Sequence, residues 1–209
     1  MRLILVGTNK KLCEAWQHYF KEFSEVEIVH DSFENLPEYD CMVSAANSFG
    51  IMDGGIDLAI TKYFGEQLMQ RVMDRIRQEY RGEQPVGTSF VIETRMEKHP
   101  YLAHTPTMRY PMSQFRTDVP YTAMWAMLNA VANFNLAHNN PIQVLACPGL
   151  ATGVGGVPEL EAARQMALAY RYFITPLPKV DWDYALERQE AIRFGGYYGY
   201  SLVMEGEKS

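Results

Sequence analysis

Two kinds of apolar pattern alternate along the chain. In the first kind, short and largely apolar runs have the length of a β-strand. They lie at residues 3–7, 26–29, 41–47, 87–94, 101–105 and 142–147, and Pro106 is expected to end the strand at 101–105. In the second kind, apolar residues recur every three or four positions, as on one face of a helix. These stretches lie at about residues 8–23, 55–80, 121–137 and 158–173, and Thr8 or Asn9 is suited to cap the first of them. The alternation predicts a three-layer α/β/α fold, in which helices cover both faces of a mixed, mostly parallel central sheet.

The stretch from Cys41 to Asp57 carries the strongest local signal. A strand pattern ends at Asn47, a loop that contains glycines follows, and a helical pattern begins at Gly55. Apolar residues then recur every four positions, at Ile56, Ile60, Phe64, Leu68, Val72 and Ile76. At the start of a helix the backbone N–H groups have no partner and the macrodipole is positive, so an anion is stabilised there. We therefore expect an anionic ligand beside this loop.

Residues 148–158 repeat this arrangement after the strand predicted at 142–147. They read PGLATGVGGVP, and Pro158 stands where a proline often opens a helix. The loop lacks the lysine of a GxxxxGK[ST] phosphate loop, and no GxGxxG follows the first strand, which argues against a nucleoside triphosphatase and a Rossmann dinucleotide site. Two such loops at the carboxyl ends of neighbouring strands favour a diphosphate that lies across the sheet. The alternative is that the glycines mark tight turns only.

Composition and charge narrow the class of protein. The 209 residues and the 47% hydrophobic content are typical of one globular domain. We expect a core at about residues 1–175 and a C-terminal appendage at 176–209, because Thr175-Pro176-Leu177-Pro178 is the only boundary-like segment. The net charge of -6 argues against nonspecific binding to nucleic acid or to an anionic membrane. Three cysteines without paired spacing, and no apolar run of about 20 residues, favour a cytoplasmic protein.

Four short segments occur in a characteristic order. They read HDSF at residues 30–33, SAANSFGIMDGGIDLAI at 44–60, HTP at 104–106 and ATGVGGVP at 151–158. In order and spacing these segments resemble the macro domain (Appr-1″-p processing) family, an α/β/α module that binds ADP-ribose. The resemblance spans about residues 26–173 and includes the ten-residue separation of Asn47 and Asp57. The amino-acid sequences of the loops also resemble those of a bacterial and phage-associated branch of that family.

The resemblance implies a role for each matching position. Asp31 would accept a hydrogen bond from the adenine amino group, and the N–H of Ser32 would contact the base. Asn47 would bind the hydroxyls of the distal ribose and Asp57 would orient or activate a water, so these two are the candidate catalytic residues. Backbone N–H groups would hold the diphosphate from both sides, at Gly54, Gly55 and Ile56 and at Thr152, Gly153, Val154, Gly155 and Gly156. We expect no metal and no cofactor.

Several of these residues have a structural alternative. Asp31 is also suited to cap a turn, Asn47 to form an Asx-turn, and Asp57 to complement a helix dipole. His104 belongs to the residue type that titrates near neutral pH, but its place in a strand pattern favours a hydrogen-bonded core histidine. Candidates for stacking on adenine have the spacing of packing residues: Tyr170, Tyr172, Phe173, Tyr197, Tyr198 and Tyr200.

The chain also departs from the family pattern. Ser44 replaces the first Asn of N-A-A-N, Met52-Asp53 replaces two loop glycines, and Ala151 replaces serine. Gly155 stands where the family has Phe or Tyr, so the ring that packs over the distal ribose is missing. The departures bear on catalysis and affinity more than on the architecture of the cleft.

Three functions of different classes follow. The first is binding of ADP-ribose or an ADP-ribosyl derivative at the carboxyl ends of the sheet, with hydrolysis of an ADP-ribosyl linkage or an ADP-ribose ester. The second is a non-catalytic module that binds ADP-ribose, NAD-derived metabolites or ADP-ribosylated targets. The third is a vestigial macro fold with a structural role. The expected partner is ADP-ribose or an ADP-ribosylated substrate, while the oligomeric state and the role of residues 174–209 stay open.

Overall fold

The computed structural model describes residues 1–139 and 141–196. Its strands form one six-stranded sheet in the order β2-β1-β6-β3-β5-β4. The strands are β1 (Arg2–Val6), β2 (Val26–Val29), β3 (Cys41–Asn47), β4 (Phe90–Glu93), β5 (Tyr101–Met108) and β6 (Val144–Cys147). β1 is parallel to β2 and β6, and β3 is parallel to β5 and β6, whereas β4 is antiparallel to β5. The predicted mixed, mostly parallel sheet is confirmed.

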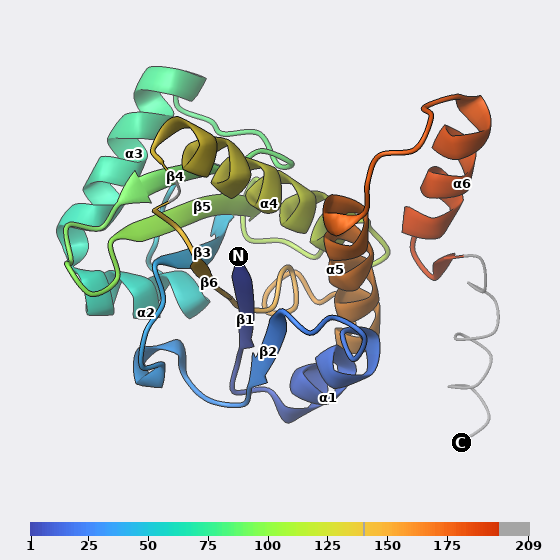
Figure 1. Cartoon of the computed structure of the whole chain (residues 1–209). Coiled ribbons are helices and arrows are strands. Elements are labelled where there is room, and N and C mark those ends of the chain that lie inside the picture. The colour runs from blue at the N-terminus through green and yellow to red at the C-terminus, as the bar shows by residue number, and fades with distance from the viewer. Residues whose placement is uncertain (140, 197–209) are drawn as a thin grey trace.

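Helices cover both faces of this sheet (Figure 1). They are α1 (Lys10–Tyr19), α2 (Gly55–Phe64), α3 (Glu66–Tyr80), α4 (Val119–Ala137), α5 (Glu159–Ile174) and α6 (Trp182–Ile192), with a short 3-10 turn at Phe33–Asn35. α1, α4 and α5 pack on one face, and α2 and α3 pack on the other. The three-layer α/β/α architecture predicted from the alternating pattern is therefore confirmed.

Each face of the sheet buries its own apolar core. On the side of α1, α4 and α5, the side chains of Trp16, Met127 and Met166 have no exposed surface. On the side of α2 and α3, the same holds for Ile60 and Leu68. Burial of one such side chain contributes about 1.5–3 kcal/mol. The two cores fix the sheet between them and so fix the strand ends at which the cleft described below lies.

The helix predicted at residues 55–80 is two helices, and this prediction is wrong. α2 ends at Phe64 and α3 begins at Glu66, because Gly65 between them has a φ of 91°, which does not continue a right-handed helix. The four-residue repeat nevertheless holds across the break. Its members all belong to one core: Ile60, Leu68, Val72 and Ile76 are buried, and Ile56 and Phe64 pack against them.

Pro106 does not end its strand, contrary to the prediction. β5 continues to Met108, and Pro106 lies opposite Ala46 of β3. The register then shifts so that Asn47 lies opposite Met108, which leaves Thr107 as the extra residue of a bulge. Proline has no N–H for the ladder and is tolerated where a bulge interrupts pairing. The bulge lies where β3 and β5 end, beside the cleft.

Other boundaries differ from the prediction by a few residues. β4 begins at Phe90 rather than at Gly87, β6 begins at Val144 rather than at Ile142, and α4 begins at Val119. α1 begins after Asn9, whose side chain accepts a hydrogen bond from the N–H of Leu12, and it already ends at Tyr19. Asn9 therefore caps α1, as one of the two residues proposed for that role.

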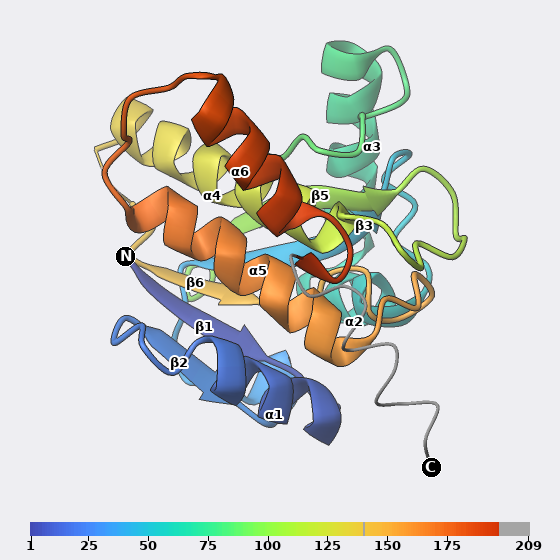
Figure 2. The same ribbon diagram turned by 90° about the vertical axis from the view of Figure 1, so that its right-hand side faces the viewer.

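The segment after residue 174 contains a helix that the apolar pattern did not indicate. α6 lies across α4 and α5 on the side away from the sheet (Figure 2). Three of the candidates for stacking on adenine lie outside the described residues: Tyr197, Tyr198 and Tyr200. The division into a core and an appendage stays a prediction. Among the helices in the described ranges, none combines the length and the apolar composition that crossing a bilayer requires.

Candidate functional site

A cleft of about 500 Å³ opens at the carboxyl ends of the parallel strands. In an open parallel sheet, ligands bind outside these strand ends. Residues from the ends of β1, β3 and β5 and from the loop after β6 line the cleft together with the first turn of α2. The predicted site residues that line it are Asp31, Ser32, Asn47, Gly54, Gly55, Ile56, Asp57, Thr152, Gly153, Val154 and Gly155. Gly156 is not among the lining residues, and its N–H donates to the carbonyl of Gly153 at 3.0 Å.

The first glycine loop, residues 53–57, leads into α2. Gly54 is the residue before the helix, and Gly55 has a φ of 54°, a conformation that favours glycine. The first helical hydrogen bond runs from the N–H of Leu58 to the carbonyl of Gly54 at 3.1 Å. The N–H groups of the first turn before Leu58 therefore have no acceptor within the helix. A side chain at Gly54 or Gly55 would meet no atom within 4 Å, so this backbone lies open toward the cleft.

The second glycine loop, residues 148–158, is wound more tightly. Ala151 has a φ of 59°, a conformation uncommon for a residue other than glycine. Its carbonyl accepts a hydrogen bond from the N–H of Val157 at 3.1 Å. A Cβ atom at Gly155 would lie 2.5 Å from the same carbonyl oxygen. The aromatic ring that the family has at this position therefore has no room on this backbone.

Asn47 holds the loop that follows β3. Its Oδ1 accepts hydrogen bonds from the N–H groups of Phe49 at 3.0 Å and Ile51 at 3.3 Å, and its Nδ2 donates to the carbonyl of Ile51 at 2.7 Å. The Asx-turn foreseen as the structural alternative for Asn47 is present. Because an amide nitrogen has two N–H donors, the bond to Ile51 leaves one of them for another partner.

Asp57 is the most perturbed carboxyl group of the cleft. It lies in the first turn of α2, is 5% exposed, and accepts a hydrogen bond from Ser44 Oγ at 2.6 Å. The pKa of Asp57 is raised to about 7, and burial is the main cause. The hydrogen bond from Ser44 lowers this pKa, and the nearby charge of Asp53 contributes to the rise. Near neutral pH the protonated and ionised forms of Asp57 are therefore both populated. Ser44, a departure from the family pattern, is the residue that orients this carboxyl group.

Asp31 and Ser32 lie at the exposed edge of the cleft. Asp31 Oδ1 accepts hydrogen bonds from Asn35 Nδ2 at 2.8 Å and from the N–H of Ser32 at 2.7 Å. Both bonds keep the pKa of Asp31 below its ordinary value, the bond from Asn35 being the stronger cause. The turn-capping role considered for Asp31 is thus present. The Ser32 N–H, which the resemblance assigns to the adenine base, is occupied by this carboxylate.

His104 does not line the cleft. It has no exposed surface, its Nδ1 lies 2.6 Å from Gln84 Oε1, and burial lowers its pKa to about 3. The interpretation of His104 as a hydrogen-bonded core histidine is confirmed. Tyr170 is likewise a core residue, in contact with the rings of Phe20 and Phe23.

Glu34 and Thr107 also line the cleft, although the sequence pattern did not predict them as site residues. Glu34 accepts a hydrogen bond from Ser32 Oγ, and its nearness to Asp31 and Ser32 in the chain was the available signal. Thr107 reaches the cleft through the bulge of β5, a feature that no local pattern reveals.

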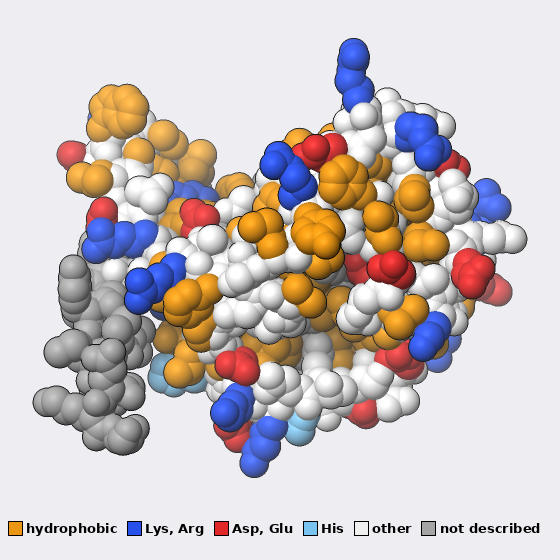
Figure 3. Space-filling view, turned by 180° about the vertical axis from the view of Figure 1, so that it is seen from behind, with side chains coloured by type: hydrophobic (Ala, Val, Ile, Leu, Met, Phe, Trp, Pro, Cys, Tyr) orange, Lys and Arg blue, Asp and Glu red, His pale blue; other side chains and the backbone are white. Residues whose placement is uncertain are grey.

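The charge of the cleft is unusual for an anion site. The described residues that line it include the carboxyl groups of Asp31, Glu34, Asp53 and Asp57 but no lysine, arginine or histidine. Within the described ranges, no three acidic, histidine or cysteine side chains are placed to share a metal ion. Outside the cleft, basic and acidic side chains are interspersed over the face seen in Figure 3. Any anion in the cleft is therefore held by backbone dipoles.

Comparisons with known proteins agree with this geometry. A family model described as "Macro domain" matches residues 43–166. An "Uncharacterized protein" of Aquifex aeolicus is 30% identical over 149 residues, which cover 71% of this chain and 82% of that protein. An "O-acetyl-ADP-ribose deacetylase" of Citrobacter rodentium is 30% identical over 157 residues, 73% of this chain and 81% of that protein.

A solved structure shares the fold. The Oceanobacillus iheyensis macrodomain with ADP superposes with a TM-score of 0.54 at 19% identity, over 82% of this chain and 86% of that one. At this identity the likeness concerns the fold alone. The sheet order, the two glycine loops and the sequence matches lead to the same conclusion: the chain belongs to the macro domain family.

Proposed function

We propose that this chain binds ADP-ribose or an ADP-ribosyl derivative in the cleft and hydrolyses a bond at the distal ribose. The observation that carries the proposal is that two glycine loops, each next to a helix start, line one cleft across the strand ends. The volume of about 500 Å³ suits a ligand of this size. The printed names of the relatives support the ligand class, since one is an O-acetyl-ADP-ribose deacetylase and one structure holds ADP.

The arrangement of the cleft supports one orientation of the ligand. Asp31 stands exposed at one edge with an ionised carboxylate, suited to accept a hydrogen bond from the adenine amino group. The diphosphate would lie between the first turn of α2 and the loop at 152–155, which offer N–H groups from opposite sides. The distal ribose then lies near Asn47 and Asp57, where the free N–H of the Asn47 amide can donate to a hydroxyl.

The absence of lining cations among the described residues has a consequence for affinity. Backbone dipoles hold a diphosphate only where its oxygens lie close to the N–H groups, and they attract little at long range. We therefore expect affinity to depend on the shape of the two loops and only weakly on salt. Ligands that carry phosphate but are too short to reach both loops should bind more weakly for the same reason.

Hydrolysis is supported by Asp57. A carboxylate with a pKa of about 7 accepts a proton well at neutral pH, which is the property of a general base. Ser44 fixes one carboxylate oxygen at 2.6 Å and so orients the group at the cleft wall. In the proposed step a water oxygen bonds to the carbon of the distal ribosyl group, or to the carbonyl carbon of its ester, and the leaving group departs with the electron pair of the bond that breaks. The proton of the water passes to Asp57 and from there to the leaving group.

One observation favours the non-catalytic alternative. The crowded backbone at Gly155 has no room for the family's ring over the distal ribose, so this part of the ligand is less enclosed. Asp57→Ala separates the alternatives, because an enzyme loses turnover while it keeps binding, whereas a pure binding module has no turnover to lose.

The first test is a calorimetric titration of the full chain with ADP-ribose, with ADP and AMP as controls. We expect saturable binding to ADP-ribose that weakens stepwise when the distal ribose and then a phosphate is removed. Binding should also raise the unfolding temperature, because a ligand that binds only the folded state stabilises it. If millimolar ADP-ribose gives neither heat nor thermal stabilisation, both binding and hydrolysis in this cleft are excluded.

A matched pair of variants locates the binding. Gly153→Glu adds a carboxylate where a side chain meets no atom within 4 Å, so the fold should tolerate it while the diphosphate is repelled. Leu136→Glu makes the same addition at an exposed position of α4. We expect Gly153→Glu to lose at least about tenfold in affinity, or ~1.4 kcal/mol, and Leu136→Glu to bind like the unaltered chain.

A further inference from the structure

Helix α6 is fastened to α4 and α5 by one arginine. Arg188 donates hydrogen bonds to the hydroxyl of Tyr121 from Nε at 3.0 Å and from Nη2 at 2.5 Å, and to that of Tyr184 at 2.6 Å. Its guanidinium also lies 4.4 Å from the ring centre of Trp125 and 4.3 Å from that of Tyr172. Arginine in such contact with several rings is a strong attachment point.

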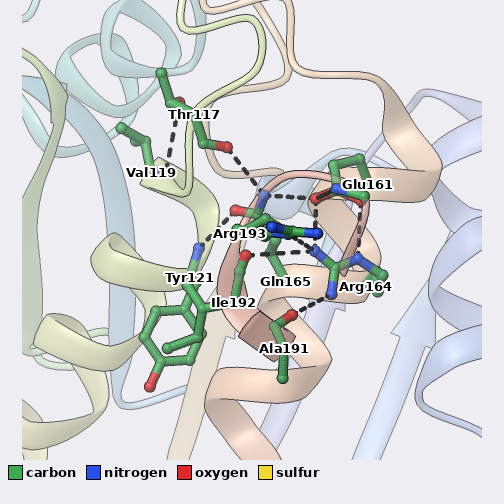
Figure 4. Close-up of polar contacts among 10 residues, drawn as sticks. Thr117, Val119, Tyr121, Glu161, Arg164, Gln165, Ala191, Ile192 and Arg193 are labelled. Atoms are coloured by element: carbon green, nitrogen blue, oxygen red, sulfur yellow. Dashed lines mark hydrogen bonds and ion pairs between the residues drawn. The ribbon is translucent and has the colours of Figure 1, made fainter. Parts of the chain in front are cut away.

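The C-terminal end of α6 is held by a second arginine, Arg164 of α5 (Figure 4). Its side chain is 16% exposed and donates to the last carbonyl oxygens of α6 and the residue after it, those of Ala191, Ile192 and Arg193, at 2.7, 3.4 and 2.9 Å. Glu161 holds Arg164 by two hydrogen bonds, at 2.7 and 2.8 Å. The N–H of Gly195 also donates to Glu161, at 3.1 Å. The chain after α6 is thus tied to the side chains of α5.

Gln165 extends this network toward the cleft. It has no exposed surface, and its Nε2 donates both to Glu161 Oε1 at 2.7 Å and to the carbonyl of Thr117 at 2.9 Å (Figure 4). Its Oε1 accepts from the N–H of Tyr121 at 3.3 Å. One buried amide therefore joins α5, the start of α4 and the loop at residues 109–118 that precedes α4.

The loop at 109–118 in turn holds the second glycine loop. The N–H and the Oγ1 of Thr117 both donate to the carbonyl of Gln114, at 3.1 and 2.6 Å. The N–H of Gln114 donates to the carbonyl of Gly155 at 2.6 Å, and Gly155 lines the cleft. The rings of Phe115 and Phe194 also meet edge to face with their centres 5.7 Å apart. Hydrogen bonds therefore run without interruption from the end of α6 to the wall of the cleft.

We propose that Gln165 is a positioning residue for the second glycine loop and that α6 is the clamp that keeps it in place. The inference rests on the proposed function, since the loop is where the diphosphate would bind. Hydrogen-bond donors must lie within a few tenths of an ångström of the ligand oxygens, and a displacement of about 1 Å weakens their contribution strongly. Gln165 acts through Thr117, Gln114 and Gly155 and does not itself touch the ligand.

The test compares variants of the full chain. Gln165→Met keeps the approximate shape of the side chain but removes its donor and acceptor. Gln17→Met makes the same change at an exposed position of α1. Val131→Ala removes buried apolar volume from α4 at a position outside the network and so serves as the stability control. Arg188→Ala releases α6, and Trp182→Ala, at a position 89% exposed on the same helix, is its control.

The first readout is amide hydrogen exchange of the free protein. In Gln165→Met and Arg188→Ala we expect faster exchange at residues 113–117 and 151–157 and unchanged exchange in the first glycine loop. The three control variants should exchange like the unaltered chain at both loops. Because this readout needs no ligand, it judges the positioning role even if the chain fails to bind ADP-ribose. Unchanged exchange in Gln165→Met overturns the proposal.

The second readout is the ratio of affinities for ADP-ribose and adenosine. Adenosine has no phosphate to reach the second loop, so we expect Gln165→Met to lose about tenfold in affinity for ADP-ribose alone. A loss shared equally by both ligands and matched by Val131→Ala would mean a general stability role and would overturn the proposal. If Gln165→Met does not fold, Arg188→Ala carries the same test with a smaller expected loss.

Discussion

The two glycine loops of the cleft follow one plan, in which a strand, a turn that contains glycines and a helix succeed one another, yet they are built differently. In the first loop, Gly54 and Gly55 face open space, and a buried carboxyl group, Asp57, follows directly. In the second loop, Gly149 and Gly155 are crowded, since a Cβ at Gly149 would lie 2.4 Å from Thr152 Oγ1.

The contrast teaches that glycine serves two purposes in one cleft. In the first loop it leaves the backbone accessible to a ligand and places Asp57 at the wall. In the second loop it permits a tight winding that no side chain would allow, and contacts with residue 114 hold that winding from outside. Changes in the first loop should therefore act on protonation and ligand contact, whereas changes at the crowded glycines of the second loop should act on folding stability.

The largest expected effect is the pH dependence that Asp57 imposes on folding. Its pKa of about 7 in the folded protein lies above the ~3.9 of an unfolded aspartate, so the folded state binds the proton more tightly. Stability should therefore fall as the pH rises from about 4 to about 7, by at most about 4 kcal/mol from this group. Asp57→Asn should lose this part of the slope and also any turnover. Urea unfolding at a series of pH values measures it, and equal slopes for both proteins would contradict the assignment.

A pair of substitutions within the second loop should separate crowded from open glycines. Gly155→Ala should destabilise the fold by about 1–3 kcal/mol, because its Cβ collides with the Ala151 carbonyl. Gly153→Ala, with no atom within 4 Å and no strained φ, should change stability by less than about 1 kcal/mol. Thermal unfolding compares them, and similar losses in both variants would remove the distinction between the two glycines.

Ser44→Ala tests whether the hydrogen bond to Asp57 beside the first loop stabilises the ionised carboxylate. The variant removes the donor to Asp57, so the ionised carboxylate should be less stable and the pKa of Asp57 higher still. We expect a loss of about 1–2 kcal/mol at pH values where Asp57 is ionised and a smaller loss where it is protonated. Ser24→Ala, at an exposed position, is the control. A loss that does not change with pH would show that the hydroxyl acts on packing alone.

Gly54→Ala should have the smallest effect on the fold. Gly54 has an ordinary extended φ of -140° and open space beside it, so alanine should be neutral or stabilise by about 0.4–1 kcal/mol. The added methyl group lies at the cleft, and we expect weaker binding of ADP-ribose without any loss of thermal stability. A fall in unfolding temperature would instead place Gly54 with the crowded glycines.

Local sequence patterns were sufficient to predict those features of the fold that depend on interactions between residues close in sequence. The cap at Asn9, the core face of α2 and α3 and the strand–loop–helix unit around Asn47 all depend on residues close in sequence. The predictions at Gly65 and Pro106 were wrong for different reasons. Whether Gly65 ends a helix depends on its backbone dihedral, and whether Pro106 ends a strand depends on the strand that it pairs with. α6 went unpredicted since its position depends on Arg188 and on aromatic side chains more than 60 residues away, such as Tyr121.

The residues that the family resemblance assigned to the ligand lie together in the structure, with one exception. All of them line the cleft except Gly156, whose N–H is used inside the loop. It did not reveal Glu34, Thr107 or the network through Gln165, because these come together only in the folded chain. The ligand roles of the lining residues, the cytoplasmic location and the phage-associated branch stay predictions.

The balance of charge in the cleft has one more consequence. A diphosphate that enters beside four carboxyl groups and no lining cation among the described residues should raise the pKa of Asp57, which makes its ionised form a stronger base but favours the protonated form in population. Near neutral pH, where Asp57 is only partly protonated, each binding event would then draw hydrogen ions from the solvent. The buffer would release them, and its heat of ionisation would add to the heat of binding. One and the same complex would thus give different calorimetric enthalpies in two buffers, and the difference would count the protons that the cleft takes up.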